Sequence, residues 1–95
     1  MIKKFKRVEV IEAIQFLGTK ESFDEIRAWV GEDFYYDYQV YPRVFLRSEE
    51  KRKYYGIDTN DWVVRRDGVF SGLSQQDMDF YQFKELGISI VFKND

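Results

Sequence analysis

The first regular pattern of hydrophobic and polar positions covers residues 8–16, which read VEVIEAIQF. The even positions are apolar apart from Glu12, the odd positions are mixed, and glycine and proline are absent. An alternation with a period of two is typical of a strand whose two faces meet different surroundings. We therefore predict a strand with one mainly apolar face, which Gly18 and Thr19 bring to an end.

Two later segments have the spacing of amphipathic helices. Ser22 and Glu25 match a capping box, in which the serine oxygen accepts a hydrogen bond from a first-turn N–H. This pattern predicts a helix of about two turns that ends at Gly31 and lies across a sheet. Ser74 is predicted to cap a second helix, which runs to about Lys84. The predicted inward-facing residues are Phe23, Ile26, Trp29 and Val30 in the first helix and Met78, Phe80 and Tyr81 in the second.

The remaining segments alternate strand-forming residues with turn residues. Residues 34–47 contain the only proline, Pro42, so they form an edge strand or two strands broken near Tyr41 and Pro42. Asp67 and Gly68 have the spacing of a tight two-residue hairpin. The other predicted elements are strands at 54–57, 62–65, 69–73 and 88–92, a solvated charged tip at 48–53 and a turn at 58–61.

The order of these elements predicts an α+β fold. We expect a mainly antiparallel sheet of four to six strands with two short helices on one face. A length of 95 residues suits a single domain over residues 1–95. Aromatic residues make up 19% of the chain, more than so small an interior can enclose, and we therefore expect a homo-oligomer.

The residue types present limit the chemistry of the protein. The chain has no Cys and no His, which removes thiol nucleophiles, imidazole bases, disulfides and zinc fingers. Of the carboxylate pairs, Asp58 with Asp61 fits a turn, and Asp77 with Asp79 fits the start of a helix. Neither pair has a glycine-rich loop or metal-ligand spacing beside it. We therefore predict a binding protein with no catalytic residue, no metal and no cofactor.

The charges are nearly balanced, with 15 Lys and Arg against 17 Asp and Glu and a net charge of −2. No global basic field attracts nucleic acid, so direct DNA binding is not expected. No apolar run has the roughly 18 residues of a membrane span, and Glu9 and Glu12 interrupt the apolar core that a signal peptide would need. Together with the absence of cysteine, these observations favour a cytoplasmic location.

Four short segments resemble, in the same order, a group of small proteins from tailed phages and prophages. That group typically has a V-E-A-I-Q-F-like strand, a G-D-W-[IV]-[IV] turn and strand, a G-x-[FY] hairpin and a closing P-x-x-F-x-x-x-Y helix. Here Asn60 stands in place of the turn glycine, and the chain continues beyond the closing helix. The resemblance implies a phage accessory protein that acts in the cytoplasm of the host cell. The matching segments are VEVIEAIQF at 8–16, NDWVVR at 60–65, DGVFS at 67–71 and DMDFY at 77–81.

Arginines and aromatic residues alternate in the middle of the chain. Guanidinium groups bind phosphate through paired hydrogen bonds, and an aromatic ring can stack on a base, so this combination suits a nucleotide. The competing interpretation is pairing with acids across strands or packing of cations on aromatic rings. Arg65 and Arg66 are consecutive and point to opposite faces if both lie in a strand. Our candidate ligand contacts are Arg43, Arg47 and Arg65 for phosphate and Tyr41 and Trp62 for a base, although Trp62 also suits a core position.

Protein binding is the competing function. Exposed tyrosines and arginines over 34–47 suit an interface, because these residue types dominate binding hot spots. We therefore predict a non-enzymatic phage accessory or anti-defence protein that binds and inhibits a host factor. The alternative is a sponge that sequesters a cyclic nucleotide defence signal, by analogy with small phage proteins of similar layout. A small structural phage protein is the second alternative.

Overall fold

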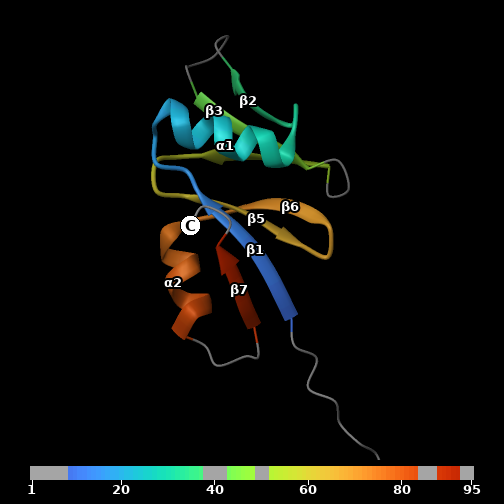
Figure 1. The fold of residues 1–95 in the computed structure, drawn as a ribbon, viewed down its shortest axis with the longest axis vertical. Helices are drawn as coiled ribbons and strands as arrows, with labels where there is room; N and C mark the ends of the chain where they lie inside the picture. Colours follow the sequence, from blue (N-terminus) through green and yellow to red (C-terminus); the bar gives the residue numbers. More distant parts are fainter. Residues whose placement is uncertain (1–8, 38–42, 49–51, 84–87, 93–95) are drawn as a thin grey trace, which may run out of the picture.

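The part of the chain that the structure describes forms two β-sheets and two helices (Figure 1). The computed structural model describes residues 9–37, 43–48, 52–83 and 88–92. The predicted α+β class is confirmed, with two helices and mostly antiparallel strands. The prediction of one sheet with four to six strands is corrected, because the described residues form seven strands in two sheets. The elements are β1 Glu9–Gln15, α1 Lys20–Val30, β2 Phe34–Asp37, β3 Arg43–Ser48, β4 Lys53–Ile57, β5 Trp62–Arg66, β6 Val69–Leu73, α2 Gln75–Phe83 and β7 Ile88–Phe92.

The four-stranded sheet has the order β6-β5-β1-β7. The β5–β6 hairpin turns at Asp67 and Gly68, whose φ angles of 51° and 78° are the positive values that a type I′ turn needs. The predicted tight hairpin is therefore confirmed. β1 pairs antiparallel with β5 and parallel with β7. The segment containing α2 connects β6 at one edge to β7 at the other, which is the long crossover that strands running in the same direction require (Figure 1).

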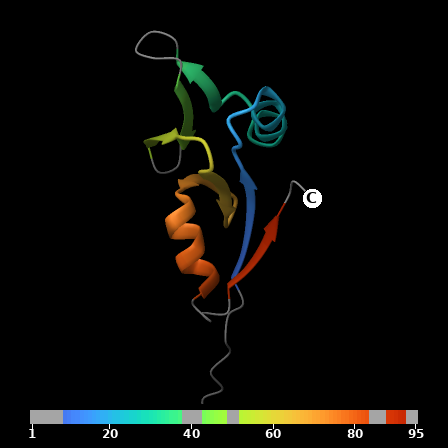
Figure 2. The ribbon, with the colours of Figure 1, turned by 90° about the vertical axis from the view of Figure 1, so that its left-hand side faces the viewer.

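The three-stranded sheet has the order β2-β3-β4, and both of its pairs are antiparallel. Residues 34–47 therefore contain two strands, which decides between the two interpretations of this stretch. Pro42 and the tip residues 49–51 lie outside the described residues. The sheet lies beyond the end of the four-stranded sheet (Figure 2), and β3 and β4 contact β6.

A turn at 58–61 carries the chain from one sheet into the other. Asn60 has a φ of 77°, a left-handed conformation that asparagine adopts more readily than most other non-glycine residues. Its N–H donates to the carbonyl oxygen of Phe16 at 2.7 Å, and the Phe16 N–H donates to that of Asp61 at 2.8 Å. The predicted turn is confirmed, and these bonds hold it against the end of β1.

The buried side chains that the structure describes form two clusters on opposite faces of the four-stranded sheet. Ile14 and Val63 pack with α1 and the three-stranded sheet, whereas Ala13 and Val64 pack with α2. Because successive residues of a strand point to opposite faces, the helices lie on either side of this sheet (Figure 2). The expectation that both lie on one face is wrong. The inter-sheet core contains Ile14, Phe16, Phe23, Ile26, Phe34, Val44, Leu46, Ile57 and Val63, and the α2 core contains Ile11, Ala13, Trp62, Val64 and Met78.

The cap of α1 differs from the prediction. Thr19 is the N-cap, and its hydroxyl oxygen accepts from the Ser22 N–H at 3.1 Å. Ser22 is buried in the first turn, where its hydroxyl donates to the Thr19 carbonyl at 2.9 Å. The helix therefore starts before Ser22 and has 11 residues, about three turns instead of two. It ends at Gly31, as predicted, with a φ of 96°.

The cap of α2 agrees with the prediction. The Ser74 hydroxyl accepts from the Asp77 N–H at 3.1 Å, and the Ser74 carbonyl accepts from the Met78 N–H at 2.9 Å. Met78 points inward and is 1% exposed, but Phe80 is 53% exposed, so its predicted inward position is wrong. The side chain of Tyr81 lies outside the described part of the structure.

Candidate functional site

Trp62 is part of the α2 core. Of its two predicted roles, base contact and core residue, the structure therefore gives it the second. Its side chain is 8% exposed, and the indole N–H donates to the Gln75 Oε1 atom at 2.7 Å. The same oxygen accepts from Gln15 Nε2 at 2.9 Å, and Gln75 Nε2 donates to Asp79 Oδ1 at 2.7 Å. This network joins β1, β5 and α2. The indole face is thus packed inside the fold, where a nucleotide base does not reach it.

Arg65 lies on the opposite face of β5. Its Nε atom donates to Glu12 Oε1 at 2.8 Å, from the neighbouring position across the sheet. The guanidinium carbon lies 5.8 Å from the ring centroid of Trp29 and 5.9 Å from that of Phe70. Both distances fall within the range of cation–π attraction. Arg65 therefore pairs with an acid across strands and packs on aromatic rings, as expected from the interpretation that competed with phosphate binding.

Arg47 lies in the other sheet, on β3. Its Nε and Nη2 atoms donate to Asp33 Oδ1 at 3.0 Å and 2.8 Å. Arg43 is paired in register with Asp37 on β2, but its side chain is not described, and Tyr41 lies outside the described residues. Among the predicted contacts that are described, Arg47, Arg65 and Trp62 lie on three separate surfaces, so the structure does not bring them into one site.

The three-stranded sheet has a surface that faces away from the inter-sheet core. We call it the outer face and define it by Tyr35, Phe45, Arg47 and Tyr54. Phe45 is the register partner of Tyr35, and their rings stack with centroids 6.1 Å apart. Tyr54 pairs with Arg47 and is 66% exposed. The outer face thus combines aromatic rings with a guanidinium group on a regular sheet.

A hollow of about 270 Å³ adjoins one end of the outer face. It is lined by Arg47, Ser48, Arg52 and Tyr54. Two guanidinium groups, a hydroxyl and an aromatic ring are a donor set suited to a phosphate-bearing molecule. The sequence interpretation of 48–53 as a solvated tip missed Arg52. Arg47 and Tyr54 are register partners across the β3–β4 hairpin. Recognising this hairpin in the sequence would have placed Arg47, Arg52 and Tyr54 close together.

The phenol of Tyr35, on the outer face, has a shifted pKa. Partial burial raises the pKa of its phenol above the usual 10.0, and the acidic groups of Tyr54 and Asp37 raise that pKa further. Arg47 opposes this shift. Tyr35 therefore keeps its proton at neutral pH and can both donate and accept a hydrogen bond.

The carboxylate pairs have local structural roles. The Asp58 N–H donates to Asp61 Oδ2 at 3.1 Å and the Asp61 N–H to the Asp58 carbonyl at 3.0 Å, which closes the turn. Asp77 is in the first turn of α2, and Asp79 accepts from Gln75. Within the described residues, no three His, Cys, Asp or Glu side chains gather as a metal site would require. None of the described helices has the length and apolar character to cross a membrane.

The chain matches no protein-family model, and comparisons with curated proteins and with solved structures find no match.

Proposed function

We propose that the protein is a non-enzymatic phage accessory protein that binds and inhibits a host protein through its outer face. The supporting observation is the exposed combination of Tyr54 with the stacked Tyr35 and Phe45 and with Arg47. Tyrosine and arginine are enriched in hot spots, and a sheet holds such side chains at little further entropic cost. The resemblance of the sequence to small phage proteins supports the cellular context, the cytoplasm of the host.

The outer face also defines the chemistry of the partner. Arg47 is already paired with Asp33, whereas Arg52 and Lys53 are exposed at the end of the hairpin. We therefore expect a partner with an apolar depression that receives Tyr54 and acidic groups that meet the hairpin end. A positive hairpin end meeting acidic groups favours encounter and register, while the aromatic contacts supply most of the affinity.

The test is capture from host lysate followed by binding measurements with the purified partner. Tyr54→Ala and Phe45→Ala should each weaken the complex by about thirtyfold or more, as expected for hot-spot residues. Phe80→Ala is the matched control, because Phe80 is an exposed aromatic residue on α2. A partner whose affinity is unchanged by both outer-face variants, or lowered equally by the control, would contradict the proposal.

The hollow beside the outer face favours one alternative, a sponge for a cyclic nucleotide signal. Arg47 and Arg52 would contact phosphate, and Tyr54 would stack on a base. Protein purified from infected or signalling cells should then release a nucleotide on heating, and Arg52→Gln should lose it. Arg27→Gln, at an exposed position on α1, should retain it. Turnover of the nucleotide by the purified protein would contradict both the sponge and the non-enzymatic inhibitor.

Self-association is part of the proposal, and it also bears on the second alternative, a small structural phage protein. Light scattering should give a mass that is a multiple of 11.5 kDa at micromolar concentration. A mass near that of one chain would contradict self-association. Capture of virion components instead of host proteins, again lost with Tyr54→Ala, would favour the structural role.

A further inference from the structure

The described strands end at four sheet edges, formed by β6 and β7 in the four-stranded sheet and by β2 and β4 in the three-stranded sheet. An edge strand presents backbone N–H and C=O groups to which a further strand can pair. Proteins discourage such pairing with charged residues or proline, and glycine weakens it. β2 contains Asp37, β4 contains Lys53 and Gly56, and β6 contains Gly72. β7 has the sequence ISIVF, without any of these residue types, and is therefore the edge best suited to a further strand.

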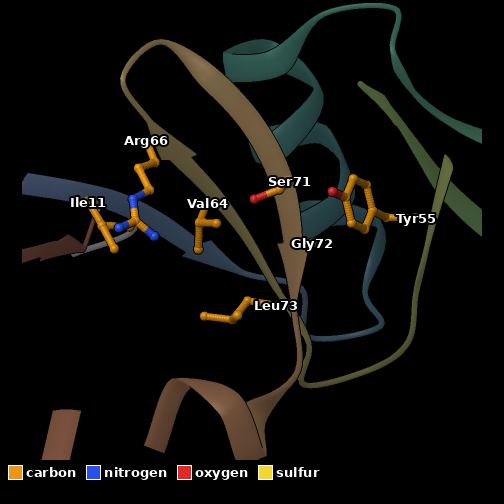
Figure 3. A pocket seen from close by; sticks show the side chains of 7 residues that line it. All are labelled: Ile11, Tyr55, Val64, Arg66, Ser71, Gly72 and Leu73. Carbon is orange, nitrogen blue, oxygen red and sulfur yellow. The ribbon is translucent and has the colours of Figure 1, made fainter. Parts of the chain in front are cut away.

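The packing around the two edges of the four-stranded sheet points to the same strand. β6 is packed against β3 and β4, and Figure 3 shows Tyr55 of β4 beside Gly72 of β6. The Tyr55 Cβ atom is 3.1 Å from the position that a Cβ on Gly72 would occupy. β7 lies at the opposite margin of the sheet (Figure 2), and no further described strand pairs with its outer edge. Within the described residues, β7 thus provides the open edge of this sheet.

The described side chains of β7 fix the strand on one face and leave it exposed on the other. Phe92 packs against the α2 core, with its ring centroid 5.3 Å from that of Trp62. Val91, on the other face, is the register partner of Glu12 and is 42% exposed. Glu12 is itself paired with Arg65. Because packing already holds the strand in an extended conformation, little further entropy is lost when a second strand pairs with it.

We propose that β7 pairs antiparallel with β7 of a second copy of this chain, so that two four-stranded sheets become one continuous sheet. A two-fold axis at Ile90 pairs all five residues of the strand, and any other register pairs fewer. This register forms roughly four to six backbone hydrogen bonds. It also closes the assembly, because both copies use the same edge and leave no β7 edge for a third copy. Pairing of β7 with a different edge would instead continue into a fibre.

Antiparallel pairing gives the dimer a definite arrangement. Residues opposite each other across such a pair lie on the same face of the sheet. Therefore α2 of both copies lies on one face, and Val91 of one copy is diagonally next to Val91 of the second copy on the other face. The two copies run in opposite directions, so their three-stranded sheets lie at opposite ends and both outer faces stay available. This interface is thus separate from the surface proposed for the host protein, and either proposal can fail without the other.

The experiment is sedimentation equilibrium of the full chain and of two charged variants. The wild type should have a mass of twice 11.5 kDa at micromolar concentration. Val91→Lys and Val91→Glu each place two like charges as diagonal neighbours and remove an apolar contact, so each should raise the dimer dissociation constant by at least about tenfold. An equimolar mixture of the two variants brings opposite charges together and should restore the dimer, which unfolded variants would not do. Leu17→Lys is the matched control, because Leu17 is an apolar residue of similar exposure, 49%, outside the strands.

Amide hydrogen exchange locates the interface. Outward-pointing amides of residues 88–92 should exchange more slowly at high than at low protein concentration, whereas the edge amides of β2 and β4 should not change. A dimer that both Val91 variants leave intact, or one whose protection lies in β2 or β4, would overturn the assignment to β7. A mass that keeps growing with concentration would overturn the closed dimer. A mass near 11.5 kDa throughout would overturn both this interface and self-association, but not host-protein binding. Capture of a host protein that is lost with Val91→Lys and kept with Tyr54→Ala would show that β7 receives a foreign strand instead of a second copy.

Discussion

Gly72 occupies the point where β6 passes beneath the three-stranded sheet. A Cβ atom added at this position would lie 2.9 Å from Ile57 Cδ1 and 3.1 Å from Tyr55 Cβ. Ile57 is 3% exposed, so its end methyl group has little room to move. The Tyr55 Cβ atom is attached directly to the backbone of β4. Gly72→Ala therefore requires the two sheets to separate by a few tenths of an ångström.

Two opposing effects determine the magnitude. Crowding a well-packed interior by one carbon costs about 1–3 kcal/mol. Replacing glycine by alanine also restricts the unfolded chain, which stabilises the protein by about 0.4–1 kcal/mol. The net expectation is a loss of about 1–2 kcal/mol in the free energy of unfolding. For a domain of this size, the melting temperature should fall by roughly 5–15 °C.

The assay is urea denaturation of Gly72→Ala, Ile57→Val and the double variant. Ile57→Val removes the Cδ1 atom that the new methyl group would meet, and alone it should cost about 0.5–1.5 kcal/mol. Because the closest contact of the new methyl group is then removed, the loss in the double variant should be smaller than the sum of the single losses. A Gly72→Ala protein as stable as the wild type, or strictly additive losses, would refute this account of the sheet junction.

Three further predictions concern the packed and paired residues. Trp62→Phe should lower the free energy of unfolding by about 1–3 kcal/mol in thermal melts, because it loses indole volume and the bond to Gln75; an unchanged melting temperature would contradict the network. A double-mutant cycle with Glu12→Gln and Arg65→Met should give a coupling below about 1 kcal/mol that shrinks in high salt, and a larger, salt-independent coupling would contradict a partly exposed pair. The raised pKa of Tyr35 contributes stability that is present below the unfolded pKa of 10.0 and lost as the pH rises through the folded pKa. When the pH is raised from neutral to alkaline, Tyr35→Phe should therefore lose less of its free energy of unfolding than the wild type, as measured by denaturation. Equal losses would contradict a raised pKa of Tyr35.

Elements closed by short-range hydrogen bonds could be predicted from the sequence alone. The Asp67–Gly68 hairpin needs two residues that tolerate positive φ, and the cap of α2 needs a hydroxyl at Ser74 that meets the Asp77 N–H three residues later. The reason is that these geometries depend on residues that are neighbours in the chain.

The start of α1 shows where this local reasoning fails. Thr19 and Ser22 can each cap a helix, and the local sequence around them does not show which of the two does so. The structure uses Thr19 because Ser22 is buried and its hydroxyl oxygen accepts the N–H of Leu17, which precedes the helix, at 3.1 Å.

The sequence by itself thus determined the class of fold, most of the strands and the residue types available for binding. Alternation along β5 indicated that Trp62 and Arg65 face opposite sides, but it did not indicate which surface covers each side. That depended on pairing across long sequence separations, as between Glu12 and Arg65, which are 53 residues apart. The tertiary structure alone buried Trp62 beneath α2, engaged Arg65 with Trp29 and left the outer face exposed on a separate sheet, because burial depends on which distant element packs against each strand.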